Sequence, residues 1–182
     1  YEVNVPARYG LALWESLMTA GERDGVMPFG IEAMDTMRME KGHFIVGRDT
    51  DGTVTPNDLG LQWLLKLDKE KFLGKRSLSL AELARTDRPQ MVGLLAEDKT
   101  AVIPEGGQII REMRAERPLP LEGHVTSSCM SPTLGRGIAL AALKGGQARV
   151  GEKLIVYSLG KTWPVTVCEP RFYDLDNSRV RL

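Results

Sequence analysis

Apolar residues recur at helical spacing in the first part of the chain. One apolar stripe predicts a helix that ends near Gly21, and it consists of Leu11, Trp14, Leu17 and Met18. A second helix is predicted over residues 31–41, with Gly42 as its left-handed cap, because glycine adopts a positive φ without steric cost. The buried face of this helix is expected to carry Ile31, Met34 and Met37.

The remaining patterns before residue 85 are shorter. Residues 2–5 alternate in the manner of a strand, which places Glu2 on the face opposite Val3 and Val5. Three further short elements are predicted: strands over residues 43–47 and 59–67, and a helix over residues 77–84.

The pattern changes after residue 87 to short apolar segments separated by turn residues. Strands are predicted over residues 91–96, 107–113, 123–127, 137–143, 153–157 and 162–168. Many short strands with frequent turns are typical of a small antiparallel barrel or jelly roll. We therefore expect a β domain over residues 88–182, preceded by a mixed domain over residues 1–87.

Composition excludes some classes of function. The chain has 24 basic and 24 acidic residues among 182, and this balance argues against a general nucleic-acid binder. Cys129 and Cys168 are too few for a disulfide framework, and no Cys/His cluster has metal-ligand spacing, so we expect a cytoplasmic protein without a metal site. No apolar run approaches the roughly 20 residues that span a bilayer, so no membrane association is expected. Because the chain begins without methionine, in what reads as a strand, we expect it to be part of a longer protein.

Two stretches of the sequence are unusual. Residues 37–56 join a helix end to a turn dense in aspartate and threonine, and residues 124–140 carry a serine-rich run followed by Ser131-Pro132-Thr133-Leu134-Gly135. Together they resemble the folate-binding family of the glycine-cleavage T-protein (aminomethyltransferase), and within it the C-terminal part of heterotetrameric sarcosine oxidase alpha subunits. The resemblance runs over nearly all of the chain. It implies an α+β fold, with the latter part of the folate-binding α/β region over residues 1–87 and the C-terminal β-barrel, jelly-roll-like, over residues 88–182.

The resemblance also implies a function. In that family a flavin on another subunit oxidises sarcosine, and the folate region of the alpha subunit captures the one-carbon unit as 5,10-methylenetetrahydrofolate. Tetrahydrofolate is therefore the implied cofactor, and the other sarcosine oxidase subunits are the implied partners in sarcosine catabolism. Flavin and NAD would belong to other parts of the complex, because this sequence has no G-x-G-x-x-G loop. The chain by itself is expected to be inactive as an oxidoreductase.

Two alternatives remain open: an aminomethyltransferase of the glycine cleavage system, and a non-catalytic domain for subunit assembly. T-proteins carry an arginine in the helix before the Arg-x-Glu-x-Gly end, where this chain has Met34. That departure favours the oxidase branch.

Three residues are candidates for binding the cofactor, and none is assigned a catalytic role. The carboxylate of Glu2 would accept two adjacent pterin N–H groups, as the glutamate of the Gly-Tyr-Glu strand does in T-protein relatives; Tyr1-Glu2 match that strand. Trp63 matches the tryptophan that follows the Asp/Thr-rich loop and would flank the pterin ring, although a core position is an equal alternative. Tyr173 lies in the tail that returns toward the folate cleft in relatives.

Other polar residues are expected to be structural. Aspartate and threonine side chains bond nearby backbone N–H groups, so Asp49 and Asp51 are interpreted as turn residues rather than as an acid–base pair. His43 and His124 are interpreted as hydrogen-bonded structural residues. The serine-rich run has no neighbouring base in sequence, which argues against a serine nucleophile.

Overall fold

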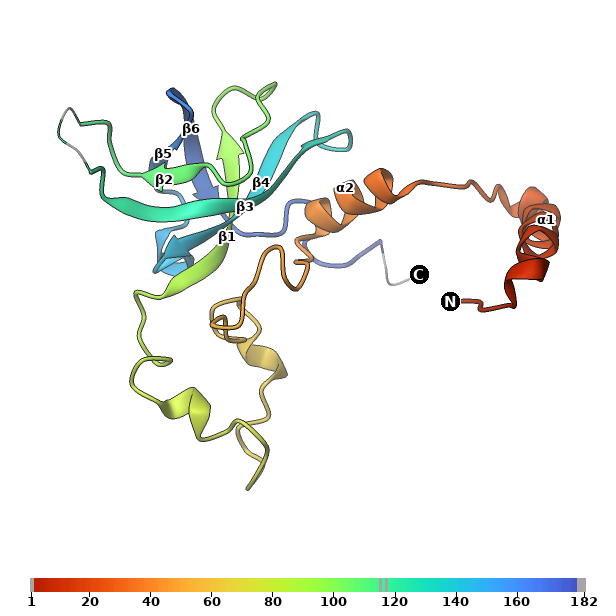
Figure 1. Cartoon of the computed structure of the whole chain (residues 1–182), viewed down its shortest axis with the longest axis horizontal. Helices are drawn as coiled ribbons and strands as arrows, with labels where there is room; N and C mark the ends of the chain where they lie inside the picture. Colours follow the sequence, from red (N-terminus) through yellow and green to blue (C-terminus); the bar gives the residue numbers. More distant parts are fainter. Residues whose placement is uncertain (1, 115, 117, 180–182) are drawn as a thin grey trace. The chain divides into compact units, whose positions relative to one another are not determined.

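The computed structural model describes residues 2–114, 116 and 118–179. The chain forms two compact units, Tyr1–Met34 and Asp35–Leu182. The first holds a single complete helix, and the second holds a small β-barrel with irregular segments attached to it (Figure 1). Among the residues that the structure describes, no helix is long and apolar enough to cross a membrane.

The first unit is built around α1 (Gly10–Gly21), which confirms the predicted helix. Short 3-10 turns flank it at Ala7–Tyr9 and Glu22–Asp24. Leu11, Trp14 and Leu17 of its apolar stripe are exposed, and Met18 is half-buried. The predicted strand over residues 2–5 is wrong: no partner pairs with this described segment, and an extended chain without a ladder of hydrogen bonds is not a strand.

The second helix, α2 (Ile31–Lys41), has the predicted bounds. Gly42, at φ 76°, caps it: its N–H donates to the Met39 carbonyl, and the His43 N–H donates to the Arg38 carbonyl. The predicted buried face is wrong, because Ile31, Met34 and Met37 are exposed and the buried residues are Met39 and Glu40. Met39 packs against Ile138 and Leu140 of the barrel, so the end of α2, not its middle, makes the contact.

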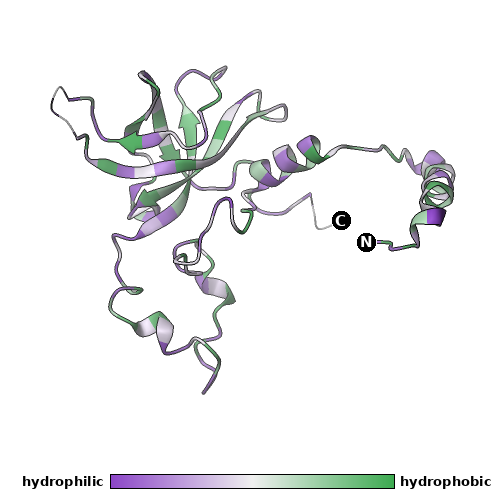
Figure 2. Ribbon diagram, viewed as in Figure 1, coloured by the Kyte–Doolittle hydropathy of each residue, from purple (hydrophilic) through white to green (hydrophobic). Residues whose placement is uncertain are grey.

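Six strands form a closed antiparallel barrel, which confirms the predicted fold class. They are β1 (Pro89–Ala96), β2 (Gln108–Ile110), β3 (Leu121–Ser131), β4 (Arg136–Lys144), β5 (Lys153–Ser158) and β6 (Lys161–Cys168). Their order around the barrel is β1-β4-β3-β2-β5-β6, so every strand has two neighbours and no edge stays unpaired. Figure 2 shows hydrophobic residues along these strands.

The barrel has an apolar interior and an apolar outer patch. Val92, Val156 and Val165 are among the residues that fill the interior. Strand β4 contributes Ala141 and Leu143 to the inside, and its alternate residues pack outward against Met39 and Phe172. Both faces of β4 are therefore covered, which explains its almost continuous burial.

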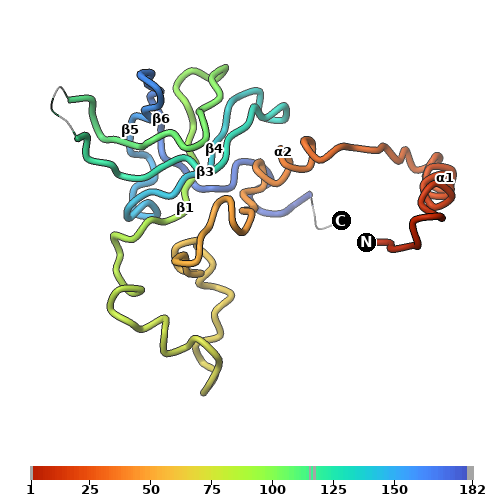
Figure 3. Tube along the Cα trace, viewed as in Figure 1, coloured from red at the N-terminus to blue at the C-terminus, as the bar shows by residue number. Residues whose placement is uncertain are grey.

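The segment between α2 and β1, residues 42–88, has little regular structure (Figure 3). The predicted strand over residues 43–47 is a single bridge between Val46 and Thr50, and the one over residues 59–67 is wrong, since it contains a 3-10 turn at Gln62–Leu64. The predicted helix over residues 77–84 shortens to Ser77–Ser79. Apolar runs this short do not distinguish a strand from an irregular loop.

Candidate ligand-binding cavity

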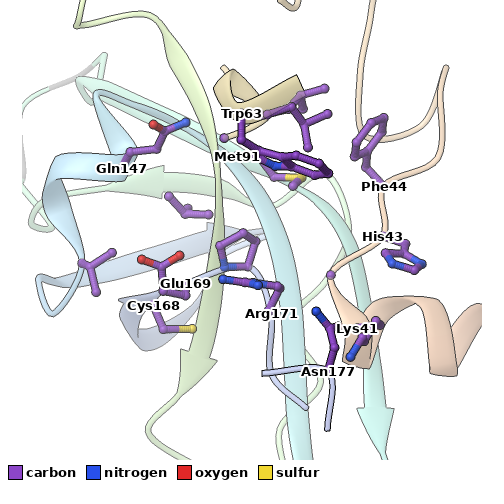
Figure 4. Close-up of a pocket in the computed structure, with 17 residues that line it drawn as sticks. Lys41, His43, Phe44, Trp63, Met91, Gln147, Cys168, Glu169, Arg171 and Asn177 are labelled. Atoms are coloured by element: carbon purple, nitrogen blue, oxygen red, sulfur yellow. The ribbon is translucent and has the colours of Figure 1, made fainter. Parts of the chain in front are cut away.

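An open cavity of about 710 Å³ lies in the second unit, beside the barrel (Figure 4). Four segments line most of it: residues 41–44 at the end of α2, the loop that includes Trp63, residues 91–92 of β1, and residues 168–171 at the end of β6. The volume lies within the range of about 300–1,000 Å³ that is usual for small-molecule sites.

Trp63 gives the cavity an aromatic wall. Its side chain is 72% exposed, so the structure places it at the surface of the cavity rather than in a core. Figure 4 shows Phe44 and Met91 around the same part of the cavity. An exposed indole beside a second aromatic ring and a thioether offers a flat ligand a broad apolar contact.

Buried polar contacts at Asp58 hold the Trp63 loop in place. The Asp58 carboxylate accepts hydrogen bonds from the Thr55 N–H and hydroxyl, both at 2.9 Å, and forms a salt bridge with Arg88 at 3.0 Å. The Asp58 carbonyl accepts the Met91 N–H at 2.7 Å, which joins the loop to β1. This turn therefore fixes the chain five residues before Trp63.

Asp49 connects the two unusual stretches of the sequence. Its carboxylate accepts hydrogen bonds from the Ser127 and Thr126 hydroxyls, each at 2.6 Å, and it pairs with Arg38 at 2.7 Å. Burial opposes its ionisation, but these contacts outweigh that effect and lower the pKa of Asp49 below its usual range. The Ile45 N–H also donates to this carboxylate at 2.8 Å, which is the contact expected of a turn residue, and the two hydroxyls join the turn to β3.

The tail after β6 is attached to the end of α2. The N–H groups of Phe172 and Tyr173 donate to the Glu40 carbonyl at 3.0 and 2.9 Å. The Glu40 carboxylate is buried and accepts hydrogen bonds from the Ser131 and Thr133 hydroxyls. The tail and α2 thus meet beside the outer face of the barrel.

Two family models match the sequence that builds this cavity and the barrel. The GCVT N-terminal domain matches residues 1–69, and the glycine cleavage T-protein C-terminal barrel domain matches residues 90–174. The chain belongs to the glycine cleavage T-protein family.

Some relatives of this chain are named sarcosine oxidase subunit alpha, and others are named aminomethyltransferase. Sarcosine oxidase subunit alpha of Corynebacterium sp. (strain P-1) is 40% identical over 98% of this chain, and that of Rhizobium meliloti is 38% identical over 100% of this chain. The chain spans only 19% and 18% of those proteins. An aminomethyltransferase of Chlorobaculum parvum is 34% identical over 96% of the chain, which spans 46% of that protein.

A solved T-protein structure shares the fold. The glycine cleavage system aminomethyltransferase T from Bartonella henselae superposes with a TM-score of 0.74 at 23% identity. The match covers 93% of this chain and 45% of the other.

The candidate residues lie in different parts of this T-protein chain. Trp63 lines the cavity; Tyr173 is half-buried in the attached tail and does not line it. Glu2 is exposed in the first unit, where the Asn4 amide donates to its carboxylate at 3.3 Å, and Tyr1 lies outside the described residues. The roles of Glu2, Trp63 and Tyr173 stay predictions.

Sequence reasoning missed the polar groups of the cavity. Lys41, His43, Gln147 and Arg171 line it, and of these the sequence interpretation covers only His43, as a structural residue. The sequence offered no signal for Gln147 or Arg171, because both lie outside the two unusual stretches and neither belongs to a recognisable motif. Within the described part of the chain, no group of three or more His, Cys, Asp or Glu side chains is placed to hold a metal ion.

Proposed function

We propose that this chain is the tetrahydrofolate-binding part of a sarcosine oxidase alpha subunit. The observation that carries the proposal is the exposed Trp63 indole at a cavity of about 710 Å³. The extent and identity of the match to proteins named sarcosine oxidase subunit alpha support the choice of branch. Met34 supports it as well, since the resemblance places an arginine at that position in T-proteins.

The residues of the cavity fit a reduced folate. A pterin is flat and carries hydrogen-bonding groups along its edge, which calls for an aromatic wall with a few polar groups nearby. Trp63 and Phe44 supply the wall, and Gln147 and Glu169 supply polar groups. Tetrahydrofolate would contribute the nitrogen atoms that accept the one-carbon unit.

The protein's own part is binding and orientation. Holding the acceptor in a fixed pose raises its effective concentration at the place where the one-carbon unit is produced, without new covalent chemistry from this chain. The proposal includes three further points. Flavin and NAD would bind other parts of the complex, the other subunits of the heterotetramer would be the partners, and the protein would be cytoplasmic. The proposal also includes the prediction that this chain alone binds no flavin, which a visible spectrum of the purified chain tests.

A titration tests the proposal. We expect 5-formyltetrahydrofolate, a stable reduced folate, to bind the chain saturably in calorimetry. Trp63→Ala should weaken binding by at least about tenfold, since an aromatic stacking contact is worth about 1–3 kcal/mol. The matched control is Trp14→Ala, which removes a second exposed indole that does not line the cavity. Absence of saturable binding, or equal losses in both variants, would overturn the proposal.

The predicted role of Glu2 needs its own test, because Glu2 lies in the other compact unit. If its carboxylate accepts two pterin N–H groups, Glu2→Ala should reduce affinity by roughly 30- to 1000-fold. Glu2→Gln should rescue little, because its amide N–H₂ would face a pterin donor. Glu15→Ala, which removes an exposed glutamate of α1, is the control. Unchanged affinity in both Glu2 variants would leave Glu2 as a surface residue.

An aminomethyltransferase of the glycine cleavage system is the second candidate. The 34% identity to an aminomethyltransferase over 96% of the chain favours it. In that case the one-carbon donor would be an aminomethylated lipoyl carrier protein. A donor assay on the intact parent protein separates the two, since only an oxidase would generate the one-carbon unit from sarcosine. A domain that serves only for assembly would bind no folate in the titration above.

A further inference from the structure

Three consecutive residues at the end of α2 contact the tail that follows β6. The Glu40 carbonyl accepts the N–H groups of Phe172 and Tyr173. The Lys41 ammonium donates to the Asp174 carboxylate at 2.6 Å and to the Asp174 carbonyl at 2.7 Å. Gly42 lies so close to the tail that a Cβ there would come within 2.4 Å of the Pro170 carbonyl oxygen.

The ion pair between Lys41 and Asp174 is shielded from solvent. The Lys41 side chain is 19% exposed and that of Asp174 is 3% exposed. The second carboxylate oxygen of Asp174 accepts the Ser178 hydroxyl at 3.2 Å and the Arg179 N–H at 3.1 Å. The Asp174 carboxylate therefore bonds to the end of α2 through Lys41 and to the following residues of the tail through Ser178 and Arg179.

The backbone at Asp174 shows that these contacts fix a specific conformation. Asp174 has φ 50°, in the left-handed region that residues other than glycine rarely adopt. Such a conformation persists where surrounding contacts determine it, and here they are the two hydrogen bonds from Lys41 and those from Ser178 and Arg179.

The contacts between α2 and the tail also shape the cavity. Lys41 and the cap residue Gly42 line it at the end of α2, and Pro170, Arg171 and Asn177 line it from the tail. The wall made by these five residues exists only while the tail lies against α2. The interior of the barrel is filled by other residues, so the barrel does not depend on this contact.

We infer that the ion pair between Lys41 and Asp174 positions one wall of the ligand cavity. The pair holds the tail against α2, so that Arg171 and Asn177 stand at the cavity and Tyr173 stays beside it. Asp174 acts without lining the cavity, whereas Lys41 lines it at the wall that the pair holds. The inference rests on the proposed function for the identity of the ligand, but not for the position of the tail.

Amide hydrogen exchange on the whole 182-residue chain tests the pair without any ligand. In Lys41→Met and in Asp174→Asn, the Phe172, Tyr173 and Arg179 amides should exchange at least about tenfold faster, because local opening of the tail becomes easier. Barrel amides such as that of Val156 should not change. Lys41→Arg, which keeps the charge, should restore protection to within about threefold.

A control variant separates this effect from the loss of an ordinary surface ion pair. Lys153→Met removes an exposed lysine that pairs with Glu97 at 3.3 Å, away from the cavity, and should leave tail exchange unchanged. Unaltered tail exchange in Lys41→Met and Asp174→Asn would overturn the inference. Faster exchange of the barrel amides in both variants would overturn it too, because the effect would then be global.

The ligand titration completes the test. In Asp174→Asn, whose side chain does not line the cavity, and in Lys41→Met, 5-formyltetrahydrofolate affinity should fall about tenfold or more, and Lys41→Arg should recover most of the loss. Faster tail exchange with unchanged affinity would refute the positioning role and leave the proposed function intact. If the unaltered chain binds no folate, the proposed function fails, while the exchange data still decide whether the pair sets the cavity wall.

Discussion

The barrel and the segment before it are held in place by different interactions. In the barrel, antiparallel ladders close on themselves around buried valines, leucines and isoleucines. In residues 42–88, several large apolar side chains are exposed, Leu73 completely, and the fixed points are the buried carboxylates Asp49 and Asp58. The cavity lies where the two regions meet. A rigid barrel therefore supplies one wall, and a segment anchored by polar contacts supplies the aromatic one.

The largest difference between the two regions should appear in the free energy of unfolding when a leucine is truncated to alanine. Leu94 is fully buried in the barrel, so Leu94→Ala should lower the free energy of unfolding by about 2–5 kcal/mol through lost burial and a cavity. Leu73→Ala makes the same chemical change at a fully exposed residue and should cost less than about 0.5 kcal/mol. Urea denaturation measures both. Equal losses would mean that residues 42–88 share the hydrophobic core.

Removing a polar anchor should have a smaller but clear effect. Asp49→Asn keeps the shape of the side chain and an oxygen that can accept both hydroxyls, but it removes the charge that pairs with Arg38 and replaces the acceptor of the Arg38 and Ile45 N–H groups with an amide donor. We expect a loss of about 2–3 kcal/mol in the free energy of unfolding. Asp51→Asn alters a neighbouring exposed aspartate and should leave the urea midpoint nearly unchanged. If Asp51→Asn lowered the free energy of unfolding as much as Asp49→Asn, the burial of Asp49 would not be the source of the effect.

The same anchor predicts a dependence of stability on pH. The pKa of Asp49 is lowered in the folded chain, so the unfolded state binds the proton more readily. Its contribution is fully present above the unfolded pKa of about 3.9 and is lost as pH falls through the lower folded value. Urea midpoints between pH 6 and pH 3 should therefore fall less steeply in Asp49→Asn than in the unaltered chain. If the urea midpoints of the two proteins fell equally with pH, Asp49 would not be the source of this pH dependence.

Limited proteolysis tests the boundary between the two regions without any substitution. The predicted domain boundary near residue 87 would give early cleavage between Arg85 and Pro89, and tryptic cleavage at Arg85 is favoured because Arg88 is buried and paired with Asp58. The barrel strands should stay intact in the resulting fragment. First cleavage within residues 123–143, with Arg85 protected, would place the boundary elsewhere.

Local patterns predicted much of the fold. Strands β1, β3, β4, β5 and β6 lie close to their predicted positions, and α2 has its predicted bounds, because alternation, helical spacing and glycine caps are properties of neighbouring residues. The same local rules failed in residues 42–88, where short apolar runs are compatible with strand or loop. They also predicted the wrong buried face of α2, because helical spacing does not show which side of a helix packs against the rest of the protein.

The sequence by itself determined the family, the number of barrel strands and the presence of Trp63 after the Asp/Thr-rich loop. Only the tertiary structure decided which side chains meet. Asp49 accepts from Ser127, 78 residues away, and Lys41 pairs with Asp174, 133 residues away. Glu40 is buried although it is charged, because Ser131 and Thr133 come from the barrel to satisfy it. The spacing of residues along the chain carries no record of such contacts, because they arise only when the closed barrel brings distant segments together.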